Sequence, residues 1–490
     1  MPGISYNAIP IDIRTPGHYI EFDNTRAMQG LPTMPHKILV IGQRLPGGII
    51  AAATPVRVLS GSQAEEFFGR GSMLAEMLKA LKEANNYTEC WAAALDDEVA
   101  GVLAAGSLTI GGTQTEAGTL NLYIAGKRVR CGVAVADTAA AIATALAAAI
   151  NTQTDLPVTA AVNGTVPQKV DLTARHKGES GNDIDLRLNY VFGEKLPKGL
   201  TATIVAMTGG TANPDIATVL TAIGAEQYHT IIMPYTDAAN LAALESELDD
   251  RWGPMVMKEG HAFAGAAGTH AAISTLGSSR NNPQTSIMGL QKSPTAPWIL
   301  AAVLGAVDAF EPDPARPRQT LVLKGILAPA EKDRNTREER NLHLHDGIST
   351  FIVDQGGNVL IERLITTYQT NPFGVEDISY LDITTMRTLA YLRYSVRARI
   401  AIKFPRHKLA NDGTNFSPGQ AIVTPKIIRA ELLALARQWE EVGLIENLDQ
   451  FKDDLLVERD GSDPNRVNAL IPPDIVNQFR VFAASVQFRL

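Results

Sequence analysis

The sequence contains few of the features that would place a chain in a specialised class of protein. Among its 490 residues are only two cysteines, Cys90 and Cys131, which excludes a disulfide framework and suits a reducing compartment. Aromatic residues make up 6% of the chain, charged residues 20% and hydrophobic residues 45%. This composition is typical of an ordinary folded protein and excludes a disordered one.

Basic charge is scarce relative to acidic charge. The net charge is -8 and the pI is about 5.7, whereas a surface that tracks phosphates is normally basic, so we expect no nucleic-acid partner. No basic segment followed by an apolar stretch marks a secretion signal near the N-terminus. The most membrane-like run, residues 132–150, is rich in alanine and interrupted by Asp137. We interpret it as a helix of a soluble protein and expect no membrane insertion.

Motifs for common catalytic chemistry are absent. The sequence has no GxxxxGK[ST], HExxH, GxSxG or CxxC pattern. The glycines of residues 42–48 follow an apolar run, but their spacing and an intervening proline indicate a plain turn and not a dinucleotide loop. Residues 235–237 follow a predicted strand, where α/β proteins commonly bind ligands, yet nothing there marks a nucleophile or a base. We therefore expect no enzyme and no cofactor.

A histidine pair and a cysteine are further candidates for site residues. His343 and His345, with Asp346, could share a metal ion, but no third ligand of definite spacing accompanies them. We prefer to interpret them as part of a surface segment and predict no metal site. Cys90 lies in an apolar strand and is expected to be a small core residue.

The hydrophobic pattern predicts a multidomain α/β protein. In residues 31–100 and 211–345, apolar runs of strand length alternate with amphipathic helical segments, which indicates βαβ units and a largely parallel sheet. We expect the two stretches to complete one core sheet. Residues 101–210 between them are rich in Ala, Thr and Gly, and predict a mostly β insertion domain with one helix. Asp137 should cap that helix, and Pro214 should begin the next one.

The last part of the chain has a different pattern of predicted helices and strands. Residues 346–490 predict an α+β C-terminal domain with long helices over 381–402 and 425–442 and a final strand over 479–490. Residues 1–30 are expected to form an extended N-terminal arm. The predicted fold is thus an α/β core sheet with a mostly β insertion domain and an α+β C-terminal domain completed by extended terminal arms.

Both predicted arms have an apolar face. The candidate residues are Ile9, Ile11, Ile13, Tyr19, Ile20 and Phe22 in the N-terminal arm, and Phe482, Val486, Phe488 and Leu490 in the C-terminal arm. Ordering such a strand costs backbone conformational entropy. The free energy gained from burying its apolar side chains and forming hydrogen bonds with a neighbouring strand is of similar size. An arm is therefore ordered only when a sheet edge receives it. That edge belongs either to the same subunit, with the termini pairing, or to a neighbour. Pairing with a neighbour would build rings or helical filaments.

Basic residues are concentrated in residues 387–408, here called the basic segment. The candidates are Arg387, Arg393, Arg397, Arg399, Lys403 and Arg406. The simplest interpretation is a solvated helix face with internal salt bridges. The alternative is a docking face for an acidic protein surface, with nucleic acid least favoured.

Four short motifs, taken in their order, indicate a family. They are PGHYIEFDNTRA at residues 16–27, HKGESGNDIDLR at 176–187, SPTAPWILAA at 293–302 and KFPRHKLANDGTNFSPGQAIVTPKIIRAE at 403–431. Together they resemble the contractile phage tail sheath proteins, specifically the Mu-like group.

The resemblance implies a structural virion protein that polymerises as stacked, usually hexameric, rings around a tail tube and contracts to drive the tube through the host envelope. The implied partners are copies of itself, the tail tube protein, and the baseplate and tail terminator proteins. The implied location is the virion tail, assembled in the host cytoplasm. Terminal arms of neighbours would complete a sheet, the insertion domain would face outward, and the C-terminal region would touch the tube. A sheath of an R-type bacteriocin or related contractile injection particle is one alternative; an α/β ligand-binding protein or enzyme is the alternative of another class.

Overall fold

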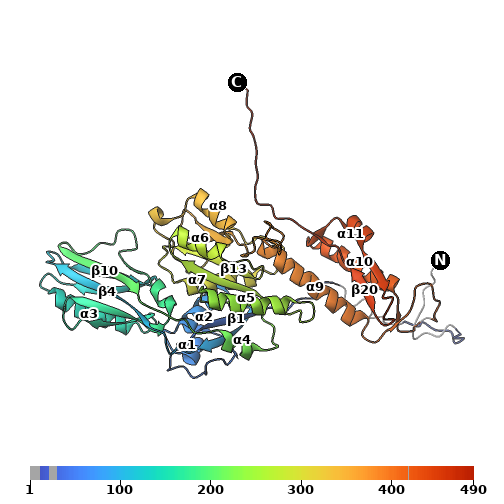
Figure 1. The fold of residues 1–490 in the computed structure, drawn as a ribbon, viewed down its shortest axis with the longest axis horizontal. Helices are drawn as coiled ribbons and strands as arrows, with labels where there is room; N and C mark the ends of the chain where they lie inside the picture. Colours follow the sequence, from blue (N-terminus) through green and yellow to red (C-terminus); the bar gives the residue numbers. More distant parts are fainter. Residues whose placement is uncertain (1–11, 21–29, 418, 490) are drawn as a thin grey trace. The chain divides into compact units, whose positions relative to one another are not determined.

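The computed structural model describes residues 12–20, 30–417 and 419–489 and divides into two compact units (Figure 1). Unit 1 contains the described parts of residues 1–35 together with residues 314–316 and 387–490. Unit 2 contains residues 36–313 and 317–386. Each unit has its own hydrophobic core.

An eight-stranded sheet forms the centre of unit 2, in the order β15-β14-β13-β12-β11-β1-β3-β2. Its strands are β1 (Lys37–Gln43), β2 (Val56–Arg57), β3 (Glu89–Leu95), β11 (Thr230–Ile232), β12 (His261–Ala267), β13 (Thr285–Gln291), β14 (Ile348–Val353) and β15 (Val359–Arg363). The six strands from β3 to β14 run parallel, and β2 and β15 are antiparallel at the edges. The strand β1, which precedes the insertion, pairs directly with β11, which follows it. The predicted α/β class is confirmed.

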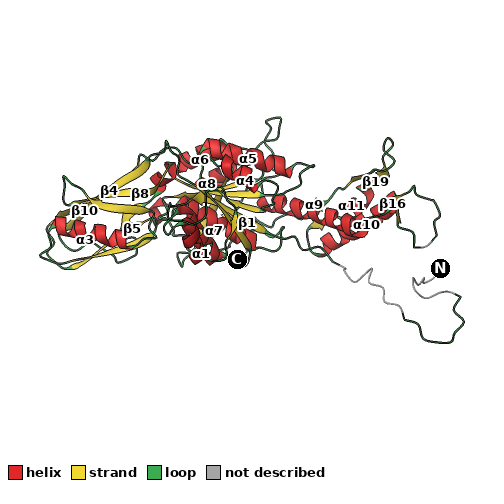
Figure 2. Ribbon diagram, turned by 90° about the horizontal axis from the view of Figure 1, so that it is seen from below, coloured by secondary structure: helices red, strands yellow, loops and turns green. Residues whose placement is uncertain are grey.

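Helices cover both faces of this sheet, which is why the central strands read as continuous apolar runs. Figure 2 shows α1 and α7 on one face, and α4, α5 and α6 on the other. The helices are α1 (Gly61–Phe68), α2 (Met73–Ala84), α4 (Ala217–Ile223), α5 (Ala238–Trp252), α6 (His270–Ser278), α7 (Pro297–Phe310) and α8 (Arg337–His345), with a short η2 (Glu331–Asp333). Residues 38–41 of β1 are fully buried, so the core of unit 2 is centred on this strand.

The residues between β3 and α4 form two further sheets. Four strands pair in the order β10-β4-β8-β7, and three in the order β6-β5-β9. The elements are β4 (Leu103–Gly112), β5 (Gly118–Ile124), β6 (Lys127–Val133), α3 (Ala139–Thr152), β7 (Val158–Val162), β8 (Lys169–Lys177), η1 (Glu179–Asp183), β9 (Leu186–Leu188) and β10 (Leu200–Thr208). The single helix α3 packs against strands of both sheets.

Two predicted helix starts are wrong by a few residues. The helix α3 is capped by Thr138, whose Oγ1 accepts from the Ala141 N–H at 3.1 Å, whereas the Asp137 carboxylate accepts from Ala134 in the preceding turn. The helix α4 begins at Ala217 and not at Pro214, because Pro214 lies in a loop. Among the described helices none is long and apolar enough to cross a membrane.

Unit 1 is built around residues 387–403 of α9 (Ile383–Lys403) and the amphipathic helix α10 (Pro425–Glu441). The remaining elements are β16 (Lys408–Leu409), β17 (Ile422–Val423), β18 (Ile445–Glu446), α11 (Leu448–Asp454), β19 (Leu456–Arg459), β20 (Val467–Leu470) and β21 (Asp474–Ile475). Trp439 and Phe451 meet edge to face at 6.3 Å in the core, and the Trp439 Nε1–H donates to Ser395 Oγ at 3.0 Å. The indole thereby fixes α10 against α9.

Candidate assembly surfaces

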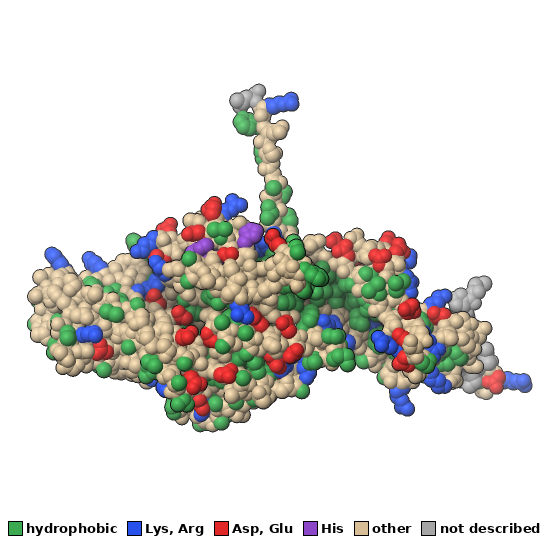
Figure 3. Space-filling model, in the orientation of Figure 1, with side chains coloured by type: hydrophobic (Ala, Val, Ile, Leu, Met, Phe, Trp, Pro, Cys, Tyr) green, Lys and Arg blue, Asp and Glu red, His purple; other side chains and the backbone are tan. Residues whose placement is uncertain are grey.

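The C-terminal arm is an exposed apolar segment. Its root is fixed, since the Val476 N–H donates to Leu444 O at 3.2 Å and the Gln478 Nε2–H donates to Ala315 O at 2.6 Å. Beyond this root, Phe482, Val486 and Phe488 are 79%, 86% and 80% exposed. Figure 3 shows apolar side chains along the arm open to solvent. Leu490 lies outside the described residues.

The predicted final strand is not formed within this chain. Residues 476–489 carry no regular secondary structure, and no described strand pairs with them. The physical reason is the one that the sequence suggests: a strand needs a partner edge, and the single chain does not supply one here. Several large apolar side chains on one extended segment are costly to leave in water, so the arm is a candidate interaction surface.

The N-terminal arm is described in part. Ile9, Ile11 and Phe22 lie outside the described residues, while Ile13, Tyr19 and Ile20 are exposed. The Tyr19 hydroxyl donates to Thr15 O at 3.0 Å and closes a local turn. Residues 12–20 contain no strand, so among the described residues the two termini do not pair with each other.

Unit 1 contains a sheet whose edges are open. The strands β19 and β20 form an antiparallel hairpin in which Leu456 pairs with Leu470, and no third described strand joins either edge. Both leucines are exposed. A two-stranded sheet is marginally stable, and its unpaired N–H and C=O groups are a template for an added strand. The hydrophobic pattern does not reveal this hairpin, because its strands are only four residues long.

The six basic candidates fall into different environments. Arg399 bonds Gln438 and lies 3.7 Å from Glu431, and Lys403 donates to the same glutamate at 2.8 Å, so both tie α9 to α10. The predicted internal salt bridges therefore exist at these two positions. Arg387 is buried and Arg393 is half-buried, whereas Arg397 and Arg406 are exposed. The six residues thus differ in burial, and Arg399 and Lys403 connect α9 to Glu431 of α10.

Residues of the insertion contact the carboxyl end of β1, on the side of the sheet where open α/β folds commonly bind ligands. In this fold the strand order reverses between β1 and β11. At the carboxyl end of β1, the Asp97 carboxylate accepts from Gln43 Nε2 at 2.7 Å and from the Lys177 N–H at 3.0 Å, and lies 3.1 Å from His176 Nδ1. His176 Nε2 in turn accepts from the N–H of Met73, the first residue of α2, at 3.0 Å. The insertion thereby occupies both the strand ends and the helix N-terminus.

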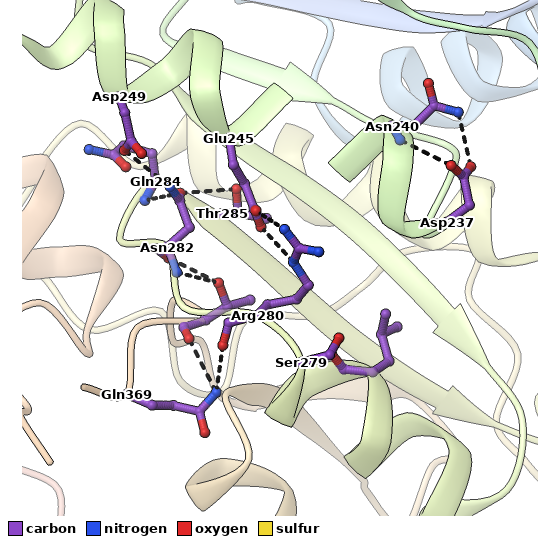
Figure 4. Close-up of polar contacts among 12 residues, drawn as sticks. Asp237, Asn240, Glu245, Asp249, Ser279, Arg280, Asn282, Gln284, Thr285 and Gln369 are labelled. Carbon is purple, nitrogen blue, oxygen red and sulfur yellow. Dashed lines mark hydrogen bonds and ion pairs between the residues drawn. The ribbon is translucent and has the colours of Figure 1, made fainter. Parts of the chain in front are cut away.

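Residues 235–237 have structural roles at this end of the sheet. Tyr235 is fully buried, and burial raises the pKa of its hydroxyl well above the usual range. Asp237 caps α5 by accepting from the Asn240 N–H at 3.0 Å, and Asn240 Nδ2 also binds the carboxylate (Figure 4). These residues stabilise the strand–helix turn, and the geometry gives no nucleophile or base.

The histidine segment is not the surface feature that the sequence favours. His343 is fully buried in α8, and its ring stacks on His270 with centroids 4.1 Å apart, while His345 stays exposed. The reason is that a capping box of Thr336 and Glu339 starts α8 and turns His343 towards α6. In the described residues no cluster of His, Cys, Asp or Glu could hold a metal ion. Cys90 is buried, and burial raises the pKa of its thiol to about 12.

The Asp97 contacts predict a pH-dependent contribution to stability. Burial would raise the pKa of Asp97, but hydrogen bonds from His176 and the Lys177 N–H outweigh it and hold the pKa below its usual range. Stability from this group is therefore present above the unfolded pKa of about 3.9 and is lost as the pH falls through the folded pKa. We expect Asp97→Asn to lower the free energy of unfolding by roughly 1–3 kcal/mol at neutral pH and by less at low pH. Urea titrations at several pH values measure this.

The neighbouring Asp96 provides the control for this measurement. Its side chain is exposed and bonds Arg44 at 2.7 Å on the surface. Asp96→Asn should change stability by less than about 1 kcal/mol. A loss from Asp97→Asn that stays constant down to low pH would contradict the assignment.

Comparison with known proteins then decides the family. The family model of the phage tail sheath protein central domain matches residues 209–367, and that of the phage tail sheath C-terminal domain matches residues 375–489. The Mu-like prophage FluMu tail sheath protein of Haemophilus influenzae is 47% identical over 489 residues, covering 99% of this chain and 100% of the relative. This chain is a phage tail sheath protein. The resemblance expected from the four motifs is confirmed.

Similarity to solved structures is low in sequence, and one of them reaches a TM-score of 0.50. The sheath tail protein of Listeria innocua superposes with a TM-score of 0.50 at 13% identity, covering 92% of this chain and 94% of that chain. The helical sheath of the anti-feeding prophage in its contracted state gives a TM-score of 0.47 at 12% identity, covering 97% of this chain and 99% of that chain. The sheath family is structural, which implies a non-enzymatic role.

Proposed function

We propose that this sheath protein polymerises as stacked hexameric rings around a tail tube, starting from a baseplate and ending at a tail terminator. Contraction of the polymer then drives the tube through the host envelope. The observation that carries the proposal is the combination of two features in unit 1: an extended arm whose apolar side chains Phe482, Val486 and Phe488 are exposed, and a hairpin that no other described strand joins.

The arms are the proposed links between subunits. An arm of one copy would add a strand to the β19–β20 edge of the next, with main-chain hydrogen bonds giving affinity and alternate side chains giving register. Such a contact is heterologous, because the donor and acceptor surfaces differ. Repetition of a heterologous contact closes a ring or continues as a helix. The N-terminal arm would act in the same way through Ile13, Tyr19 and Ile20, together with Ile9, Ile11 and Phe22.

Contraction on this account is a shift between two packings of the same subunits, biased at the baseplate. On this account the energy for contraction is stored during assembly. We further propose that the insertion domain, residues 101–210, faces outward, and that assembly takes place in the host cytoplasm.

The basic segment is proposed to form an intersubunit or tube-facing surface. Arg397 and Arg406 are exposed, Arg393 is half-buried and Arg387 is buried, whereas Arg399 and Lys403 pair with Glu431 of α10. The exposed residues of this set are therefore placed to meet an acidic surface. Exposed charge pairs of this kind are screened by salt beyond about 10 Å at 0.1 M.

Negative-stain electron microscopy of the purified protein, across a concentration series and at two ionic strengths, tests the proposal. We expect hollow tubes or stacked rings above a threshold concentration. Reversing Arg393 and Arg397 to Glu should weaken assembly more at low salt than at high salt. A uniform field of small particles at every concentration, with or without tail tube, would overturn the assembly proposal. A salt profile unchanged by the charge reversal would assign these arginines to a solvated face.

A further inference from the structure

A second exposed apolar feature lies in unit 2. Residues 371–378 form a loop in which Phe373, Val375 and Ile378 are 90%, 60% and 73% exposed. Single exposed apolar residues are common on protein surfaces, but three on one short loop form a patch. We call this loop the apolar knob.

The knob is held in one conformation by its own hydrogen bonds. Asn371 Oδ1 accepts from the N–H groups of Phe373 at 3.0 Å and Val375 at 3.1 Å. The Asn371 N–H donates to Val375 O at 2.9 Å, and Gly374 donates back to Asn371 O at 2.9 Å. Gly374 has a φ of 76°, which a side chain would disfavour. Thr370 and Glu376 form a bridge across the base of the turn.

The base of the knob is fixed to the loop between α6 and β13. Asn281 Oδ1 accepts from the N–H groups of Gln369 at 2.7 Å and Thr370 at 3.1 Å. The Gln369 amide donates to Gly277 O at 3.1 Å. It also donates to Arg280 O at 2.9 Å (Figure 4).

That loop is itself anchored to α5 by polar contacts, as Figure 4 shows. Arg280 pairs with Glu245 in a largely buried setting, and Asn282 Nδ2 donates to Asp249 Oδ1 at 3.1 Å. A continuous chain of contacts therefore runs from α5 to the knob. A rigid loop loses little conformational entropy on binding, which is the property of a preorganised anchor.

We propose that the apolar knob docks on a second copy of this chain, against the basic segment of that copy. This inference rests on the proposed polymerisation. The two surfaces match in chemistry: the knob carries exposed Phe373 beside exposed Glu376, and the basic segment carries exposed Ile402 near exposed Arg406. An aromatic anchor surrounded by complementary charge is the usual make-up of an interface hot spot. The knob lies outside both terminal arms and provides a separate contact between copies.

The first test measures assembly of the full-length chain. Phe373→Ser is expected to raise the threshold concentration for polymers at least about tenfold, as truncation of a hot-spot aromatic does. Phe192→Ser is the matched control, because Phe192 is also fully exposed but lies on the insertion. Circular dichroism melts should be unchanged for both variants. If Phe373→Ser assembles like the wild type, the knob proposal is wrong while the proposed function stands; if the wild type does not assemble, both fail.

The second test identifies the occupant. Phe373 is replaced by the photoreactive p-benzoylphenylalanine, and isotopically heavy and light subunits are mixed, assembled and irradiated. A heavy–light crosslink to residues 387–408 is the expected result. Crosslinks confined to one chain, to a tail tube protein or to another part of the second copy would overturn the proposal.

Discussion

Deleting residues 479–490 is expected to abolish polymerisation and to leave a folded subunit. The deleted segment begins after Gln478, whose Nε2–H donates to Ala315 O in unit 1. Beyond it Arg480 is half-buried and the other described side chains are exposed, and none of them belongs to the cores around Ile38 and Trp439. The melting temperature should therefore stay close to that of the full chain. Deleting residues 1–22 is expected to have the same outcome through the other arm.

The loss of assembly should be large because each subunit loses a whole strand. Burial of Phe482, Val486 and Phe488 against a neighbour is worth about 1.5–3 kcal/mol each, before any ladder hydrogen bonds. Removing that contribution corresponds to more than about a hundredfold in the threshold concentration. Sedimentation and electron microscopy of the truncated chain measure the effect.

A point variant separates the apolar face of the arm from its length. Val486→Ser should raise the threshold for assembly, whereas Gln487→Ser, on the opposite face of an extended strand, should not. Equal effects of the two variants would argue against strand pairing. Long tubes made by a chain lacking both arms would contradict the proposed links.

The hydrophobic pattern and composition of each segment predicted much of the fold, because the central helices and strands are specified by their own side chains. The apolar run 38–42 becomes the centre of β1, buried on both faces, and the apolar stripe of residues 425–442 becomes α10. The cap of α3 shows the limit of such reasoning. Asp137 and Thr138 are both good caps, and the structure uses Thr138 while Asp137 serves the preceding turn.

The candidate sites depend more on contacts that are distant in sequence. Periodicity could identify an apolar C-terminal arm, but the arm cannot form a strand without a partner edge. Arg399 and Arg397 look alike in the sequence, yet Arg399 meets Glu431 on α10 and Arg397 faces solvent. His343 was expected at the surface because charged residues surround it, and it is buried because α8 presents it to His270.

Breaking the buried ion pair of Asp308 and Arg318 by a single substitution is expected to cause a large loss of stability. Arg318 Nε donates to Asp308 Oδ1 at 2.9 Å, and the exposed fractions of the two side chains are 0% and 2%. Asp308→Asn would leave a buried guanidinium without its carboxylate, which costs about 3–5 kcal/mol. We expect the melting transition of unit 2 to fall by at least about 5 °C in calorimetry. Glu116→Gln, at the exposed pair with Lys198, is the matched control and should cost less than about 1 kcal/mol.

The double variant Asp308→Leu with Arg318→Met decides what the pair contributes. Replacing both charges by apolar groups of similar size is often neutral, because neither charge must then be desolvated. We therefore expect the double variant to be more stable than Asp308→Asn. The pair would then mainly fix the path of the chain, because it joins the last turn of α7 to Arg318, two residues after the segment 314–316 that belongs to unit 1. A single variant that melts like Glu116→Gln would show instead that the pair is dispensable.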